Sequence, residues 1–373
     1  MRRKKYALLG FAALLLTIAS SLYIVSGIQL YQGYQRAYPD WTSATGPCGA
    51  LITWSPPSVL YTGLYVNQPN LLTLRYRSPQ PQTLHITVSI PQFTQEQTFQ
   101  VKATPDFRSQ SFKPAILSPG VLDSLVGPGQ RPAEIHLHIE NSSSVVCETS
   151  ANVLLKSRQW MLWYDSARRI DNTPYLAGWV TPTAPAIQTL VGLANLRVQD
   201  NPNVYSNLPY LLGYQSGATP AEVAQEVDAI FDTLQFSYHL TYASDTVPFL
   251  QDSAQRIKLP SDILKLQYPT GMCVETTAIM ASAVESLGMR PFFIIVPGHS
   301  FLGVALSASP NAPMSYWETS DLKGGLTTDH ITGSQANIHG VGEFNQYQSE
   351  NQILEMVNVQ QERQLDDPIM PIE

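Results

Sequence analysis

The chain has 373 residues, and its 22 Lys and Arg side chains against 29 Asp and Glu side chains give a formal net charge of −7. At roughly 150 residues per domain, this length favours two or three domains with cores of their own. With 14% charged and 44% hydrophobic residues, the composition excludes a disordered chain and a polytopic membrane protein, and the acidic balance excludes nucleic acid as a partner.

The N-terminus combines four cations at residues 2–5 with an uncharged, apolar segment at residues 6–25. As a helix, this segment would be about 30 Å long, which matches the hydrocarbon core of a bilayer. The positive-inside rule keeps the basic end in the cytoplasm. We therefore expect residues 1–27 to be a transmembrane signal anchor, with the membrane as a partner and the bulk of the chain extracytoplasmic. A cleaved signal peptide is the alternative.

A linker at residues 28–46 leads into a region, residues 47–157, in which apolar and polar residues alternate. Strand-like runs include LTLRY at 72–76, TLHITVSI at 83–90 and EIHLHIE at 134–140, separated by Pro, Gly and Asn. Alternation predicts strands with one buried face, and short strands at this spacing favour an antiparallel β-sandwich.

The three cysteines are Cys48, Cys147 and Cys273. In an oxidising compartment two of them should pair. Cys48 opens and Cys147 nearly closes the predicted β-sandwich, so we expect a disulfide between them; two buried thiols are the alternative. Closing this loop would stabilise the fold by up to about 4.7 kcal/mol. Cys273 is then the free thiol.

Residues 158–345 read as a second domain in which helices precede a sheet. Thr219 and Glu222 have the spacing of a capping box, with Pro in the first turn, and predict the start of a helix. Residues 273–287 predict a mostly apolar helix that Gly288 ends.

Strands are predicted after this helix, at residues 292–296, at 299–306 and near 315–319, and residues 346–373 read as a C-terminal tail. Helices followed by an antiparallel sheet are typical of an α+β domain. The expected fold class is therefore α+β: a transmembrane helix, a β-sandwich and an α+β domain.

Cys273, His299 and Glu318 fall at positions suited to acyl transfer. Cys273 begins a predicted helix, where unpaired backbone N–H groups and the helix dipole stabilise a thiolate. His299 begins a strand, and Glu318 lies on the next one, where a carboxylate can orient the imidazole. Thiolate, imidazole and backbone donors suffice for this chemistry, so we expect no cofactor and no metal. An inert cysteine in an apolar helix is the alternative.

The segments around these residues are QRIKLPSDIL (255–264), GMCVETTAIMASAVESLGMRP (271–291), VPGHSFLGVAL (296–306) and YWETSDL (316–322). Together they resemble the bacterial transglutaminase-like superfamily, over roughly residues 160–340. The resemblance implies a papain-like core with Cys273 as nucleophile, His299 as base and Glu318 as acid.

The chain departs from this pattern at two points. The nucleophile and the base are 26 positions apart (299 − 273), fewer than in many members of the superfamily, and Phe301 stands where Trp is frequent. The expected function is a membrane-anchored extracytoplasmic peptidase, amidase or protein cross-linker acting on protein or peptide in the cell envelope. The alternative is a non-catalytic envelope binding or scaffold protein that keeps the fold.

Overall fold

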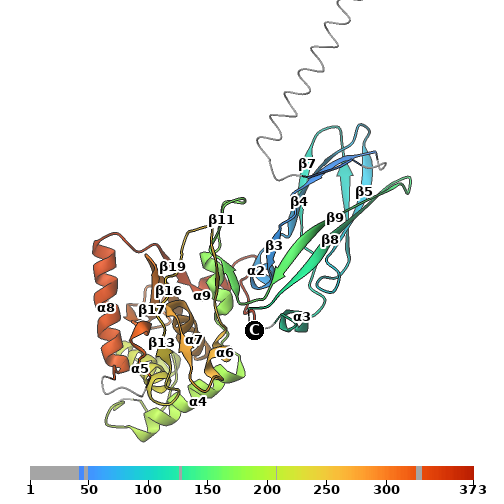
Figure 1. Cartoon of the computed structure of the whole chain (residues 1–373). Coiled ribbons are helices and arrows are strands. Elements are labelled where there is room, and N and C mark those ends of the chain that lie inside the picture. The colour runs from blue at the N-terminus through green and yellow to red at the C-terminus, as the bar shows by residue number, and fades with distance from the viewer. Residues whose placement is uncertain (1–41, 46–48, 126–127, 207, 325–329) are drawn as a thin grey trace, which may run out of the picture. The chain divides into compact units, whose positions relative to one another are not determined.

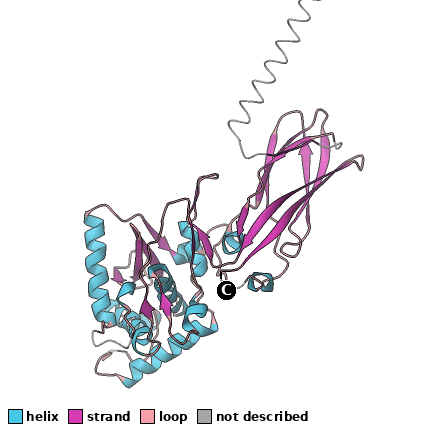
Figure 2. Cartoon of the chain, in the orientation of Figure 1, coloured by secondary structure: helices cyan, strands magenta, loops and turns pink. Residues whose placement is uncertain are grey.

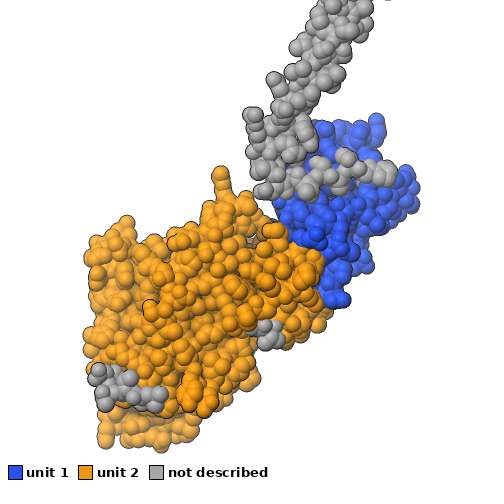
Figure 3. All heavy atoms as spheres, viewed as in Figure 1, with its two compact units in different colours: residues 1–57, 70–115, 134–152 blue, residues 58–69, 116–133, 153–373 orange. Residues whose placement is uncertain are grey.

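The computed structural model describes residues 42–45, 49–125, 128–206, 208–324 and 330–373. The chain divides into two compact units (Figure 3). The first comprises residues 1–57, 70–115 and 134–152, and the second comprises residues 58–69, 116–133 and 153–373.

Two sheets are formed between residues 42 and 156 (Figure 1). The four-stranded sheet is antiparallel throughout, in the order β1 (Thr42–Thr45), β2 (Leu51–Trp54), β4 (Leu72–Arg77), β7 (Arg108–Phe112). The five-stranded sheet has the order β3 (Val59–Tyr61), β9 (Val146–Lys156), β8 (Gln130–Asn141), β5 (Gln82–Ser89), β6 (Gln97–Ala103), and β3 runs parallel to β9.

Burial alternates along these strands, as the sequence pattern predicts. Leu84, Ile86 and Val88 of β5 are fully buried, while the residues between them are more exposed. Phe99 of β6 meets Phe112 of β7 edge to face, with ring centroids 4.7 Å apart, so side chains of the two sheets share one core. A 12-residue β8 gives the second sheet long, half-buried strands, whose β-branched and apolar residues fit a pleated surface.

Cys147 is buried and disulfide-bonded. The partner that the sequence predicts for it, Cys48, lies outside the described residues, so the pairing stays a prediction. Cys273 is a free, buried thiol.

The second unit contains a four-stranded antiparallel sheet and most of the helices (Figure 2). The sheet order is β18 (Met314–Trp317), β17 (His299–Ala305), β16 (Pro291–Val296), β19 (Glu355–Asn358). The helices are α2 (Thr62–Asn67), α3 (Gly120–Asp123), α4 (Pro185–Asp200), α5 (Pro220–Phe236), α6 (Pro260–Leu264), α7 (Cys273–Ser286), α8 (Gly333–Ser349) and α9 (Val359–Glu362).

Shorter elements complete the second unit. Its two-stranded sheets pair β10 (Trp160–Leu162) with β14 (Ala254–Arg256), β11 (Tyr164–Asp165) with β12 (Ile170–Asp171) and β13 (Thr241–Tyr242) with β15 (Thr270–Gly271). The 3₁₀ turns are η1 (Thr173–Trp179), η2 (Gln215–Gly217) and η3 (Thr319–Asp321).

Local sequence signals explain where the two central helices begin and end. The capping box at α5 is present, because Thr219 Oγ1 accepts the Glu222 N–H at 3.3 Å and the Glu222 carboxylate accepts the Thr219 N–H at 2.7 Å. Helix α7 ends before Gly288, whose φ of +75° is a left-handed conformation that glycine adopts without a steric penalty.

Helix α7 is the core helix of the second unit. Every residue from Cys273 to Val284 is buried, and the helix contacts β16, β17, α4, α5 and α6. Its few polar side chains are satisfied internally: the Thr276 and Thr277 hydroxyls lie 3.0 and 3.1 Å from Thr319 Oγ1, and Ser282 Oγ accepts the Thr181 N–H at 2.8 Å. A helix that is buried all round in this way is fixed by its surroundings and not by one apolar stripe.

The predicted membrane-spanning helix, and the membrane location that followed from it, are corrected. In the described part of the chain no helix is both long and apolar enough to cross a membrane. Its longest helices, α5 and α8, have 17 residues each, whereas a spanning helix needs about 20 mostly apolar residues, and α5 carries carboxylates. Residues 6–25, on which the prediction was based, lie outside the described residues.

Candidate active site

Cys273 is the first residue of α7 and is fully buried. The start of the helix is held by Glu275, whose buried carboxylate accepts the Met272 N–H at 3.0 Å and the Lys258 N–H at 2.6 Å. The Lys258 ammonium lies 3.3 Å from the same carboxylate. Burial raises the pKa of Glu275, and these hydrogen bonds and the lysine charge act against that rise. Sequence analysis did not single out this anchor.

His299 is the first residue of β17 and follows a turn in which Gly298 has a φ of +73°. Its Nε2 lies 3.0 Å from Glu318 Oε2, which leaves Nδ1 available to the Cys273 thiol. Hydrogen bonds with Cys273 and with Glu318 are among the causes that raise the pKa of His299.

Burial alone would lower the pKa of His299, but the hydrogen bonds and charges of Cys273 and Glu318 outweigh it and raise the pKa to about 10. The imidazole therefore keeps a positive charge at neutral pH. A positively charged imidazole beside a thiol stabilises the thiolate, which is the nucleophilic form of cysteine.

Glu318 is one residue beyond the strand that was expected to carry it. Strand β18 ends at Trp317, because the Glu318 side chain caps the following 3₁₀ turn: its Oε1 accepts the Ser320 N–H at 2.7 Å. The other oxygen faces His299, and only 5% of the side chain is exposed. The backbone N–H of Glu318 donates to the Ala336 carbonyl at 3.0 Å. Both carboxylate oxygens and the backbone thus fix its direction.

Asp321, the other acid near this position, has a different partner. Its Oδ2 lies 2.6 Å from Nδ1 of His339 on α8. Asp321 is the last residue of η3, so its direction follows from the turn and not from strand alternation. The structure therefore brings Cys273, His299 and Glu318 together and directs Asp321 to a second imidazole.

A half-buried acid on α5, Asp228, supports the strand before Glu318. Asp228 Oδ1 accepts the Trp317 indole N–H at 2.8 Å, and Trp317 is fully buried. Burial raises the pKa of Asp228 to about 7, with the charge of Asp232 adding to the rise and the indole hydrogen bond opposing it. Asp232 in turn accepts the Tyr205 hydroxyl at 2.6 Å. Sequence analysis singled out none of these acids.

Another residue that sequence analysis missed is Glu343 on α8. One ring nitrogen of His299 and one carboxylate oxygen each of Glu318 and Glu343 lie within 4.8 Å of one another. In the described part of the chain, this is the one group of His, Cys, Asp and Glu side chains compact enough to hold a metal ion. An ion there would have to replace the hydrogen bond between His299 and Glu318. That no metal takes part stays a prediction.

A hollow of about 250 Å³ is lined in part by Met272, the residue before Cys273. Arg256 stands in the same lining, where its Nε donates to Gln159 Oε1 at 2.7 Å. The other lining residues are Ala243, Asp245, Lys258 and Glu275.

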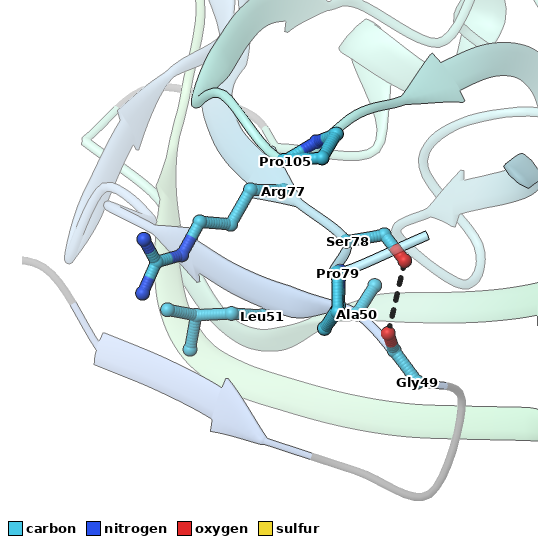
Figure 4. A pocket seen from close by; sticks show the side chains of 7 residues that line it. All are labelled: Gly49, Ala50, Leu51, Arg77, Ser78, Pro79 and Pro105. Carbon is cyan, nitrogen blue, oxygen red and sulfur yellow. Dashed lines mark hydrogen bonds between the residues drawn. The ribbon is translucent and has the colours of Figure 1, made fainter. Parts of the chain in front are cut away.

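A second hollow, of about 490 Å³, is found in the first unit (Figure 4). Leu51, Pro79 and Pro105 give it apolar walls and Arg77 extends along it, while Ser78 Oγ donates to the Gly49 carbonyl at 3.1 Å. Its lining contains no thiol, imidazole or carboxylate, so it offers no nucleophile and no base.

No protein-family model and no curated protein matches this chain.

Proposed function

We propose that the chain is a cysteine acyl-transfer enzyme of the transglutaminase-like kind, with Cys273 as nucleophile, His299 as acid and base, and Glu318 as the group that orients His299. The observation that carries the proposal is the imidazole of His299: its Nε2 lies 3.0 Å from the buried carboxylate of Glu318, and interactions with that carboxylate and with the free thiol of Cys273 raise its pKa. Thioester chemistry requires a nucleophile, a base and an acid that orients the base, and these three residues would supply one of each.

The reaction follows from this order. The Cys273 thiolate attacks the carbonyl carbon of an amide and forms the C–S bond of a tetrahedral intermediate. Backbone N–H groups at the start of α7 have no acceptor within the helix and can stabilise the oxyanion. The C–N bond then breaks, and the leaving amine takes a proton from His299.

Release of the acyl group completes the cycle. Water or a second amine gives its proton to His299 and attacks the thioester, and the C–S bond breaks to regenerate the Cys273 thiolate. Water as the acceptor makes the enzyme a peptidase or amidase, and an amine makes it a cross-linker. Glu318 keeps the imidazole in one orientation through both steps, because one of its oxygens is already held by the Ser320 N–H.

The test is the rate at which Cys273 reacts with iodoacetamide near neutral pH, followed by peptide mass spectrometry. We expect rapid labelling of Cys273 in the wild-type protein and a rate about 10²-fold lower in His299→Ala, since a positioned base contributes about that much. Cys273→Ser, which should not be labelled at that position, is the control. Labelling of wild-type Cys273 at the slow rate of an inert buried thiol would refute the proposal and favour a non-catalytic binding protein.

A further inference from the structure

Helix α8 packs closely against β18, the strand that precedes Glu318. A Cβ atom at Gly340 would lie 2.7 Å from the Trp317 nitrogen and from the Tyr316 carbonyl, so only glycine permits this approach. Phe344 stacks on Tyr316 with ring centroids 3.8 Å apart. Glu343 lies between Gly340 and Phe344 in sequence, so the contacts of these two residues determine where its side chain lies.

The position of Glu343 places its carboxyl group next to Glu318. Their oxygens belong to the group of atoms within 4.8 Å of one another, and a hydrogen bond with Glu318 is among the causes that raise the pKa of Glu343. Two carboxyl groups can share a hydrogen bond only if one of them carries a proton. The proton belongs on Glu343, because Glu318 already accepts N–H groups from His299 and Ser320.

We propose that Glu343 is a fourth member of the site, a positioning residue whose protonated carboxyl donates a hydrogen bond to Glu318 and so holds that carboxylate against His299. This inference rests on the proposed function, because it concerns the orientation of the same base. Glu343 touches neither the thiol nor the substrate in this scheme and acts through Glu318 alone.

The charges around Glu343 agree with this assignment. Burial and the charges of Glu318 and Asp321 raise the pKa of Glu343, and the charge of His299 opposes the rise. The other titratable group whose charge is linked to it is Tyr347, one turn later on α8. Asp321 cannot replace Glu343 as the donor, because it is paired with His339.

A glutamine in place of Glu343 separates this role from a purely structural one. The amide of Glu343→Gln keeps a donor of the same length, whereas Glu343→Met keeps the length and the helix propensity but has no donor. Glu343→Ala is a second donor-free variant in case the Met side chain does not pack. Gln346→Ala, an exposed position on the same helix, is the matched control, and circular dichroism checks the fold of each variant.

Two measurements are made on each full-length protein. The first is the rate of acylation of Cys273 by p-nitrophenyl acetate. The second is the signal of the His299 Nε2 proton in ¹H–¹⁵N spectra of protein labelled at histidine, assigned with His299→Ala; it reports the hydrogen bond to Glu318 whether or not the protein reacts.

We expect Glu343→Met and Glu343→Ala to lower acylation at least about tenfold and to lose the protected His299 proton, because an orienting acid that moves leaves the imidazole misplaced. Glu343→Gln should restore both, and Gln346→Ala should change neither. The inference is overturned if the donor-free variants keep the rate and the proton signal, or if Glu343→Gln is as impaired as Glu343→Met. If wild-type Cys273 is unreactive while the proton signal follows the same pattern, the proposed function fails and the positioning role stands.

Discussion

Two of the three glycines of α8, at positions 340 and 342, offer a matched pair of substitutions. An added Cβ at Gly340 would meet the backbone of β18 at 2.7 Å, and backbone atoms cannot rotate away as a side chain does. An added Cβ at Gly342 would meet nothing within 4 Å. The same change, glycine to alanine, therefore has opposite consequences two residues apart.

Both substitutions gain about 1 kcal/mol of helix propensity. Overpacking costs about 1–3 kcal/mol, and the contact at Gly340 belongs at the upper end of that range because both neighbours are main chain. We expect Gly340→Ala to lower the free energy of unfolding by about 1–2 kcal/mol and Gly342→Ala to raise it by up to about 1 kcal/mol.

Urea unfolding followed by circular dichroism measures both values, with the midpoint as the readout at constant m. The acylation rate of Cys273 should fall at the same time in Gly340→Ala only, because a displaced α8 carries Glu343 away from Glu318. Equal stabilisation by the two alanines would refute the close packing of α8 on β18, and with it the structural basis for the role of Glu343.

Two further predictions concern the acids of the site. Asp228→Asn keeps the acceptor for the indole but removes a carboxyl whose pKa is raised from 3.8 to about 7; wild-type stability should fall as pH rises from about 4 through 7, by at most about 4 kcal/mol. The free energy of unfolding of the variant, measured in urea, should therefore rise relative to that of the wild type between pH 5 and 8. A difference that stays constant with pH would contradict the argument that burial raises the pKa of Asp228. Glu318→Gln should lower acylation of Cys273 by up to about 10⁴-fold, while Asp321→Asn should change it less than about tenfold; the reverse order would assign the orienting role to the wrong acid.

The sequence predicted those features of the second unit that depend on neighbours in the chain. The Thr219 and Glu222 pair marks the start of α5, and Gly288 marks the end of α7, because caps act within one helical turn. The candidate residues Cys273 and His299 were likewise found from the starts of local elements.

The parts that the sequence did not predict depend on contacts between distant residues. Residues 333–349 are rich in glycine and polar residues, yet they form α8, because packing on β18 outweighs weak helix propensity. The one local signal was the capping-box spacing of Thr332 and Gln335. Strand β19 was missed for the same reason, since its pairing with β16 joins residues 60 to 66 positions apart.

The hydroxyl contacts of α7 also set the angle at which Cys273 faces His299. The free energy gained by burying apolar surface does not depend on direction. A helix that is apolar on every side would therefore be stabilised almost equally after a rotation about its own axis. A change of setting by one residue turns the helix by about 100°, which would carry Cys273 away from His299. The bonds from Thr276 and Thr277 to Thr319, and from Thr181 to Ser282, are directional and are satisfied in one setting only. In this core, a few hydroxyl groups hold the thiol in line with the imidazole.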